Sequence, residues 1–281
     1  MDLVNGAAIA LFNVLLIPLE ALGDEFSLVV TSGVFGILAL YVFKHISYQK
    51  GIKGTKNRIK GHLIEIRIYQ DDLVVVARSV VKILMRNFQY LGLNFGPFVP
   101  LAIPFVIVAS QMVVRYGFDP IPVEEPGRQY LAGQGVTLEV ELEPEAVGGL
   151  QVILPEGLRA LSPLTRTRSD GRAFQEFVAT AEGEWDVRLV LADGTEVVKK
   201  VYTGEHVPRA MQPERVSSFW SAWLWPAEDT LAGTSITRVA IVYPERELAY
   251  MPDGPFGIII TLIVASMAFG FAMLKPLGVQ I

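Results

Sequence analysis

Side chains that could carry out chemistry are few in this chain and lie far apart. The three histidines, His45, His62 and His206, include no pair with the spacing of metal ligands. The chain has no cysteine, which excludes a disulfide framework, a thiolate nucleophile and a cysteine-based metal site. Neither a glycine-rich phosphate loop nor a nucleophile elbow occurs. We therefore expect a non-enzymatic protein, with no catalytic residue, metal or cofactor.

The composition points to a membrane protein. Of the 281 residues, 51% are hydrophobic and only 19% are charged, against a usual ~25% in soluble domains, and the mean hydropathy is +0.40. The apolar residues concentrate in three uncharged runs, 26–43, 88–114 and 257–274. At about 1.5 Å per helical residue, each run is long enough to cross, or nearly cross, a ~30 Å hydrocarbon core. The sequence predicts three transmembrane helices.

These runs divide the chain into six expected segments. The second run contains Pro97, Pro100 and Pro104, which should kink it or split it into two half-helices. The apolar stretch 7–22 is interrupted by Asn13, Pro18 and Glu20, so we expect it to be interfacial or re-entrant. The expected segments are an amino-terminal helix (1–25), a first span (26–43), a cytoplasmic helical hairpin (44–87), a kinked second span (88–115), an outer domain (116–255), and a third span with a short tail (256–281).

Charge asymmetry predicts the orientation. Residues 44–86 contain ten basic and three acidic side chains, whereas residues 116–250 contain twelve basic and twenty-one acidic ones. Basic loops remain on the cytoplasmic side of a membrane. We therefore expect segment 44–87 and the carboxyl terminus in the cytoplasm, the amino terminus and segment 116–255 outside, and a location in a bacterial inner membrane.

The basic segment has the pattern of a helical hairpin or coiled coil. Its apolar residues recur mostly three, four or seven positions apart, and Asp71 and Asp72 mark a turn. One face carries the cations Lys53, Lys56, Lys60 and Arg67. These cations suit either anionic lipid headgroups or an acidic partner such as a ribosome. Aromatic residues are not interleaved with these cations for base stacking, since only Tyr48 and Tyr69 lie nearby, so DNA is not an expected partner.

Segment 116–255 changes to the two-residue alternation of β-strands. Examples are 136–142 (VTLEVEL) and 185–191, and Asp193-Gly194 marks a tight hairpin after the latter. Several short strands predict an all-β, immunoglobulin-like sandwich. Segment 219–226 contains three tryptophans suited to a membrane or partner interface, or to a hydrophobic plug under the sandwich, namely Trp220, Trp223 and Trp225.

Within the spans, two groups of residues are candidates for interactions. Polar side chains in the second span are Asn94, Ser110 and Gln111. Small residues four positions apart, which permit close helix packing, are the pairs Ser32 and Gly36, Gly92 and Gly96, and Ser266 and Gly270. We expect these faces to pack against each other or against other subunits.

The layout resembles the YidC/Oxa insertase superfamily, including the third subunit of the ER membrane protein complex and its archaeal relatives. The resemblance rests on the basic stretch KHISYQKGIKGTKNRIKGHLIEIRIYQDDL between the first two spans. The carboxyl-terminal residues 269–281 also resemble a group of uncharacterised bacterial membrane proteins. The layout implies a role in the insertion or assembly of membrane proteins, with client proteins and lipid as partners.

Two departures from that superfamily keep other functions open. Its insertases commonly hold a positive residue in a groove within the bilayer, whereas Arg115 here lies at the outer edge of a span. The minimal members also lack a sandwich between the second and third spans. The alternatives are a structural accessory subunit of a larger membrane complex and, less favoured, an extracytoplasmic ligand sensor.

Overall fold

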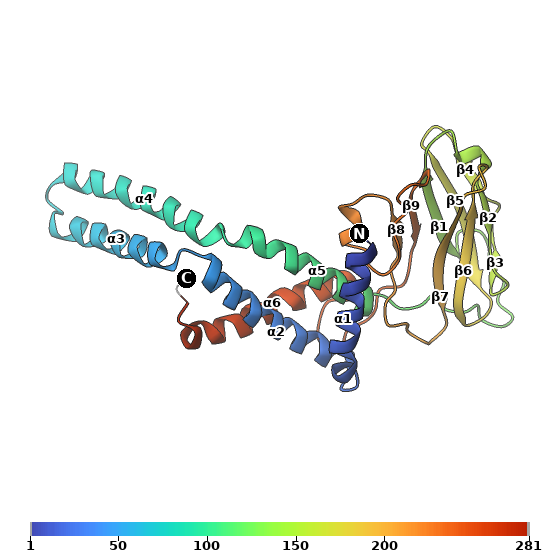
Figure 1. The fold of residues 1–281 in the computed structure, drawn as a ribbon, viewed down its shortest axis with the longest axis horizontal. Helices are drawn as coiled ribbons and strands as arrows, with labels where there is room; N and C mark the ends of the chain where they lie inside the picture. Colours follow the sequence, from blue (N-terminus) through green and yellow to red (C-terminus); the bar gives the residue numbers. More distant parts are fainter. Residues whose placement is uncertain (1, 280–281) are drawn as a thin grey trace. The chain divides into compact units, whose positions relative to one another are not determined.

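The computed structural model describes residues 2–279, which contain a helical part and a separate β part (Figure 1). The helices are α1 (Asp2–Glu20), α2 (Asp24–Ile46), α3 (Gln49–Ile68), α4 (Leu73–Phe95), α5 (Phe98–Tyr116) and α6 (Gly254–Leu277). By length and composition, three helical segments could cross a membrane: Asp24–Ile46, Leu73–Tyr116 and Gly254–Leu277. The expectation of three helical segments long and apolar enough to cross a membrane is therefore confirmed.

The chain divides into two compact units. The β unit contains the residues up to Ser27 and Val106–Ile260, and the hairpin unit contains Leu28–Phe105 and the residues from Thr261 onward. The division cuts each of the three long apolar segments. Each unit is described separately below.

Helices α3 and α4 of the hairpin unit lie side by side (Figure 1). The turn between them contains Asp71 and Asp72, as the sequence predicts. Asp72 caps α4, because its carboxylate accepts hydrogen bonds from the backbone N–H groups of Val74 and Val75 at 3.0 and 3.1 Å. A side chain that satisfies these free donors fixes where a helix begins. The local sequence thus determines the tip of the hairpin.

The apolar run expected as one second span is interrupted. Helix α4 ends at Phe95 and α5 begins at Phe98, so that Gly96 and Pro97 separate them. Proline lacks a backbone N–H and restricts the residue before it, which is why a helix ends here. Pro104 is accommodated within α5.

The β unit contains two antiparallel sheets. The strands are β1 (Val136–Leu142), β2 (Gln151–Ile153), β3 (Leu158–Ala160), β4 (Thr165–Thr167), β5 (Arg172–Ala179), β6 (Gly183–Val190), β7 (Glu196–Thr203), β8 (Glu214–Val216) and β9 (Ile236–Ile241). One sheet has the order β3-β5-β1-β9-β8, with β4 also paired to β5, and the other has the order β2-β6-β7. Short 3-10 helices occur at Val147–Gly149 and Ser221–Trp223.

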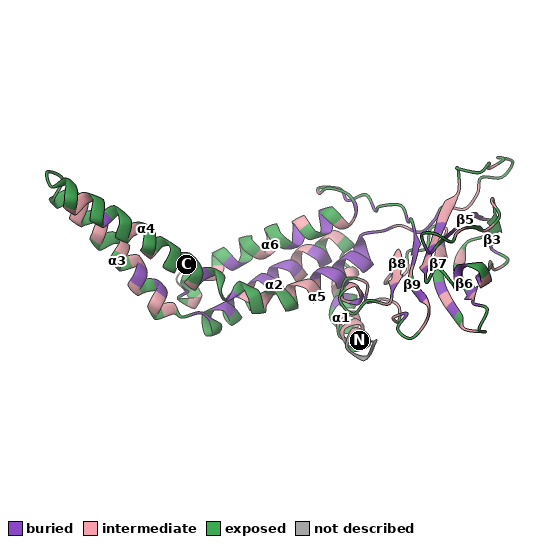
Figure 2. Cartoon of the chain, turned by 90° about the horizontal axis from the view of Figure 1, so that it is seen from above, coloured by how far each residue is buried: buried purple, intermediate pink, exposed green. Residues whose placement is uncertain are grey.

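Burial in the sheets follows the alternation seen in the sequence (Figure 2). On β6, Val187 and Leu189 are fully buried, whereas Asp186 and Arg188 between and beside them are exposed. Asp193 and Gly194 form the expected hairpin turn to β7. The sequence did not predict β3, β4, β5 and β8. Three of these are only three residues long, and β5 lacks alternation because its last three residues are all buried.

Candidate functional site

The structure places the three histidines in separate local contacts. His45 contacts the carbonyl oxygen of Tyr41 at 2.8 Å, and His62 contacts Glu65 at 2.9 Å. His206 donates its backbone N–H to the carboxylate of Glu182. Among residues 2–279, no three histidine or acidic side chains come together in a group that could hold a metal ion.

Two of the three polar residues expected in the second span, Asn94 and Ser110, form hydrogen bonds within their own helices. The Asn94 amide donates to the carbonyl oxygen of Tyr90 at 2.8 Å, and the Ser110 hydroxyl donates to that of Ile107 at 3.0 Å. The side-chain oxygens of Asn94 and Gln111 are buried and accept no hydrogen bond from the described residues. These two oxygens are available acceptors in apolar helices, where an unpaired polar atom is costly.

A buried arginine network joins α1 to the end of α5 in the β unit. Arg115 is only 3% exposed, and its guanidinium donates to the side-chain oxygen of Asn13 and, at 3.5 Å, to Glu20. Tyr116 donates to the same Glu20 carboxylate at 3.2 Å and shares a hydrogen bond of 2.9 Å with Ser27. One carboxylate therefore neutralises the arginine and orients the tyrosine.

The sequence placed Arg115 at the edge of a span but did not reveal its partners. The available signal was the interruption of the apolar stretch by Asn13 and Glu20, which are seven residues apart and so share one helix face. Because such polar positions are costly in an apolar helix, they indicate a buried partner. That partner is more than ninety residues away along the chain, and only the fold brings it close.

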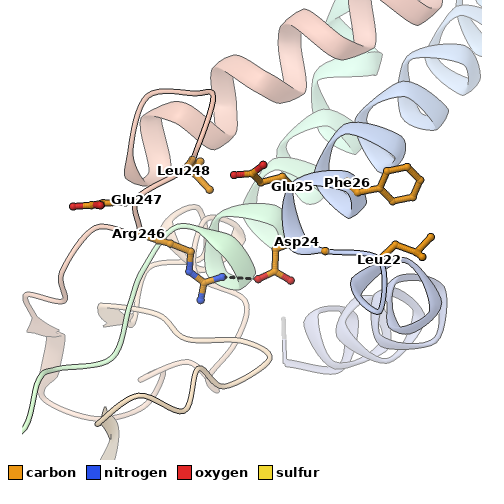
Figure 3. A pocket seen from close by; sticks show the side chains of 8 residues that line it. Leu22, Asp24, Glu25, Phe26, Arg246, Glu247 and Leu248 are labelled. Carbon is orange, nitrogen blue, oxygen red and sulfur yellow. Dashed lines mark hydrogen bonds and ion pairs between the residues drawn. The ribbon is translucent and has the colours of Figure 1, made fainter.

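A second arginine of the β unit, Arg246, pairs with two acidic side chains, and its pair with Asp24 is drawn in Figure 3. Arg246 donates to Asp119 at 2.9 Å and to Asp24, at the start of α2, at 3.1 Å. Beside it, Glu25 accepts the backbone N–H of Ala249 at 2.7 Å. These residues border a cavity of about 400 Å³, which Leu22, Phe26, Glu247 and Leu248 also line. The charged groups here join the start of α2 to the loops that carry Asp119, Arg246 and Ala249.

The expected basic face of the hairpin lies on α3. Lys53, Lys60 and Arg67 are exposed, and Lys56 is half-buried. Their spacing of three, four and seven residues keeps them on one side of the helix. The face therefore presents several cations together to the surroundings.

The small residues of α2 and α6 lie against each other in the hairpin unit. The Ser266 hydroxyl donates to the carbonyl oxygen of Ser32 at 3.1 Å. A Cβ added at Gly36 would fall on the Ser266 carbonyl oxygen and 2.6 Å from its Cα, and one at Gly270 would lie 3.5 Å from the Gly36 oxygen. By contrast, a Cβ at Gly92 would meet no described atom within 4 Å, and one at Gly96 would approach only the Gly92 carbonyl oxygen of the preceding turn.

The tryptophan segment of the β unit has an exposed side and a packed side. Trp220 is 77% exposed, and its ring meets that of Phe219 edge to face at 5.4 Å. Trp223 is half-buried, and the centroid of its ring lies 6.4 Å from that of the Phe219 ring. Trp225 is also half-buried and packs against Phe118 at 6.2 Å. The segment thus combines features of both expected roles, an interface and a plug.

A buried lysine in the β unit is a further feature that the sequence did not reveal. The Lys199 side chain is fully buried, pairs with Glu228 and donates to the carbonyl oxygen of Gln212 at 2.9 Å. Burial lowers the pKa of Lys199 below its ordinary value. On strand β7 the neighbouring Lys200 pairs with Glu184, which raises the pKa of Lys200. Lys199 thus links β7 to the segments that carry Gln212 and Glu228.

We expect the stability of the β unit to fall in strongly alkaline solution. Burial raises the pKa of Tyr202 to about 12 from its ordinary 10.0, and it also raises the pKa of Tyr243. Between pH 10.0 and about 12 the unfolded chain releases the Tyr202 proton, whereas the folded chain retains it. The free energy of unfolding therefore decreases through this range and is independent of these groups below it.

Thermal unfolding of the full chain in nanodiscs, followed across this pH range, measures the effect. The variant Tyr202→Phe should show a shallower alkaline decline, because one ionising group is removed. Equal declines in the two proteins would contradict the assignment to Tyr202.

Comparison with known proteins returns no relative: no protein-family model, no curated protein and no solved structure matches the chain. The function is therefore argued from the residues and their geometry.

Proposed function

We propose that this chain is a non-enzymatic integral membrane protein of insertase-like layout that assists the insertion or assembly of membrane proteins. The observation that carries the proposal is the helical hairpin of α3 and α4, which continues directly from two apolar helices and presents a cationic face. Such a face suits anionic partners near a membrane surface, including a translating ribosome or the charged flanks of a client protein.

The orientation and location form part of the same proposal. The hairpin and the carboxyl terminus lie in the cytoplasm of a bacterium, the amino terminus and residues 116–255 lie outside, and the membrane is the inner one. The excess of basic residues in 44–87 supports this orientation. The β domain is an immunoglobulin-like sandwich, for which two antiparallel sheets that each bury one face provide the support.

The test is to deplete the protein and follow the insertion of membrane proteins with short translocated tails. We expect slower insertion, restored by the wild-type gene but not by a variant with Lys53, Lys56, Lys60 and Arg67 changed to glutamine. A matched variant with lysine and arginine exchanged at these positions keeps the charge and should restore insertion. Unchanged insertion kinetics on depletion would refute the proposal.

A structural accessory subunit is the second candidate, and two observations favour it. The open space at Gly92 leaves a small-residue face without a described neighbour, and Trp220 presents an exposed aromatic ring. Both are suitable contacts for a permanent partner. Isolation in mild detergent separates the candidates, because a subunit carries one stoichiometric partner, whereas an insertion factor carries varied clients in small amounts.

A further inference from the structure

The hairpin unit has a long apolar face that the described chain does not cover. Seven residues of α4 alternate three and four positions apart and are all exposed: Val74, Ala77, Val81, Leu84, Phe88, Leu91 and Phe95. Leu73, Val80 and Met85 are exposed as well and widen this face. At about 100° per residue these positions cover an arc of roughly 140°. We call this surface the α4 apolar face.

The α4 apolar face points away from α3. Ser79 and Asn94 are buried, and Ile83 and Tyr90 are half-buried, which identifies the side of α4 that meets the rest of the unit. The apolar positions lie on the opposite side of the helix. Phe88 is 74% exposed, although phenylalanine is among the residues most often found inside proteins.

Helix α4 begins beyond the ends of the apolar spans. Helices α2 and α6 each carry a lysine in the last turn, Lys44 and Lys275. The first residue of α5, Phe98, lies beside Phe43 with ring centroids 5.8 Å apart, at the level of these basic ends. The 19 residues of α5 extend about 28 Å at 1.5 Å per residue, close to the thickness of the hydrocarbon core. By this reasoning α5 alone, and not the whole expected run 88–115, fills the hydrocarbon core. The α4 apolar face then lies outside the core and is left without a covering surface.

Both connections between the hairpin and the apolar helices contain a break in the helix near Lys44 and Phe98. Ser47 and Tyr48 separate α2 from α3, and Gly96 and Pro97 separate α4 from α5. Helices α3 and α4 are inclined to α2 and α6 (Figure 2). Apolar residues at the start of α5 are exposed as well, namely Phe98, Val99 and Ile103. An inclination of the hairpin toward the side of its apolar face would bring that face to the membrane surface.

We propose that the α4 apolar face docks on the anionic surface of the membrane in which its own spans lie. The charge of the helix matches that surface, because α4 contains Arg78, Lys82 and Arg86 and no acidic residue. On the helix surface Arg78 borders the apolar arc and Lys82 lies next beyond it, whereas Arg86 lies toward the buried side. Cations beside a broad apolar arc are typical of helices that lie in the headgroup region. Packing of a second copy of α4 on this face would bring the cations of the two copies close together. A coiled-coil partner would cover only a narrow apolar seam, whereas the α4 apolar face is broader than such a seam.

Because the chain contains no cysteine, a single introduced cysteine can be spin-labelled without further mutations. The full chain is reconstituted with a spin label on Leu84→Cys or, as the control on α3, on the exposed Asn57→Cys. The vesicles contain either phosphatidylcholine alone or an equimolar mixture with phosphatidylglycerol. In the anionic vesicles, the label at position 84 should become accessible to oxygen and protected from a water-soluble nickel chelate, whereas the label at position 57 should remain accessible to the chelate.

Two charge variants show whether the cations of α4 are responsible. In the double variant Arg78→Gln and Lys82→Gln, the label at position 84 should become accessible to the nickel chelate. In the double variant Lys53→Gln and Lys60→Gln on α3, it should stay protected from the chelate. Three results would overturn the proposal: a label at 84 that is accessible to the chelate in both kinds of vesicle, a label shielded from both reagents as in a protein interface, or equal effects of the two charge variants. The accessibility of the label does not depend on insertion activity, so this test can fail or succeed independently of the proposed function.

Discussion

Replacing Arg115 by methionine should destabilise the β unit and release α1 from its contact with the end of α5. The substitution leaves the Glu20 carboxylate, whose side chain is only 22% exposed, without its cationic partner, and it removes the donor to Asn13. Removing one partner of a buried ion pair typically costs about 3–5 kcal/mol, and we expect the lower end because Glu20 is partly exposed. Thermal unfolding in nanodiscs measures the loss, and hydrogen exchange in α1 locates it.

Two further variants distinguish a lost ion pair from a general effect of losing an arginine. Arg209→Met removes a cation from an exposed position nearby and should leave the unfolding temperature nearly unchanged. Combining Arg115→Met with Glu20→Met should recover stability relative to Arg115→Met alone, because no unpaired buried charge then remains. If the double variant is less stable than the single one, the cost arises from lost packing and the ion-pair explanation is wrong.

The parts of the fold that could be predicted are those that depend on neighbouring residues. Long uncharged runs identify spans because a charged group in hydrocarbon is costly, and Asp72 identifies the start of α4 because a cap acts within one turn. Alternation identified β6, since one of its faces is solvated. It failed for β5, whose buried residues Phe177, Val178 and Ala179 are consecutive.

The candidate site was less predictable because it depends on contacts between distant residues. Asn13 and Glu20 interrupt an apolar stretch, but nothing local connects them with Arg115. Lys199 follows the alternation of its strand, yet its burial depends on Glu228. Tertiary contacts therefore determine which polar residues are functional candidates and which are exposed.

The small-residue pairs show the same distinction most clearly. A spacing of four residues between small side chains indicates that another helix can pack closely there, but it does not indicate whether such a helix is present. On α2 and α6 the partner lies in the same chain, and Gly36 meets Ser266. At Gly92, with the same spacing to Gly96, the described chain provides no partner. Identical sequence patterns thus have different consequences for stability.

Replacing Gly36 by alanine should therefore destabilise the hairpin unit, whereas Gly92→Ala should not. Both substitutions put alanine inside a helix, which by itself favours folding by about 1 kcal/mol. At Gly36 the new Cβ collides with the backbone of Ser266 and separates α2 from α6, and such overpacking typically costs about 1–3 kcal/mol. The difference between the two unfolding temperatures in nanodiscs isolates the steric term from the helix propensity.

Gly270→Ala completes the comparison, because its Cβ would lie 3.5 Å from the Gly36 carbonyl oxygen, an ordinary contact distance. We expect the unfolding temperature of Gly270→Ala to be close to that of the wild type. Among the three variants, stability should therefore be lowest where the new Cβ has the least space, at Gly36. Equal unfolding temperatures for Gly36→Ala and Gly92→Ala would contradict close packing of α2 on α6. A loss of a co-purifying partner on Gly92→Ala, with stability unchanged, would instead identify the open face as an intermolecular contact and favour the accessory subunit.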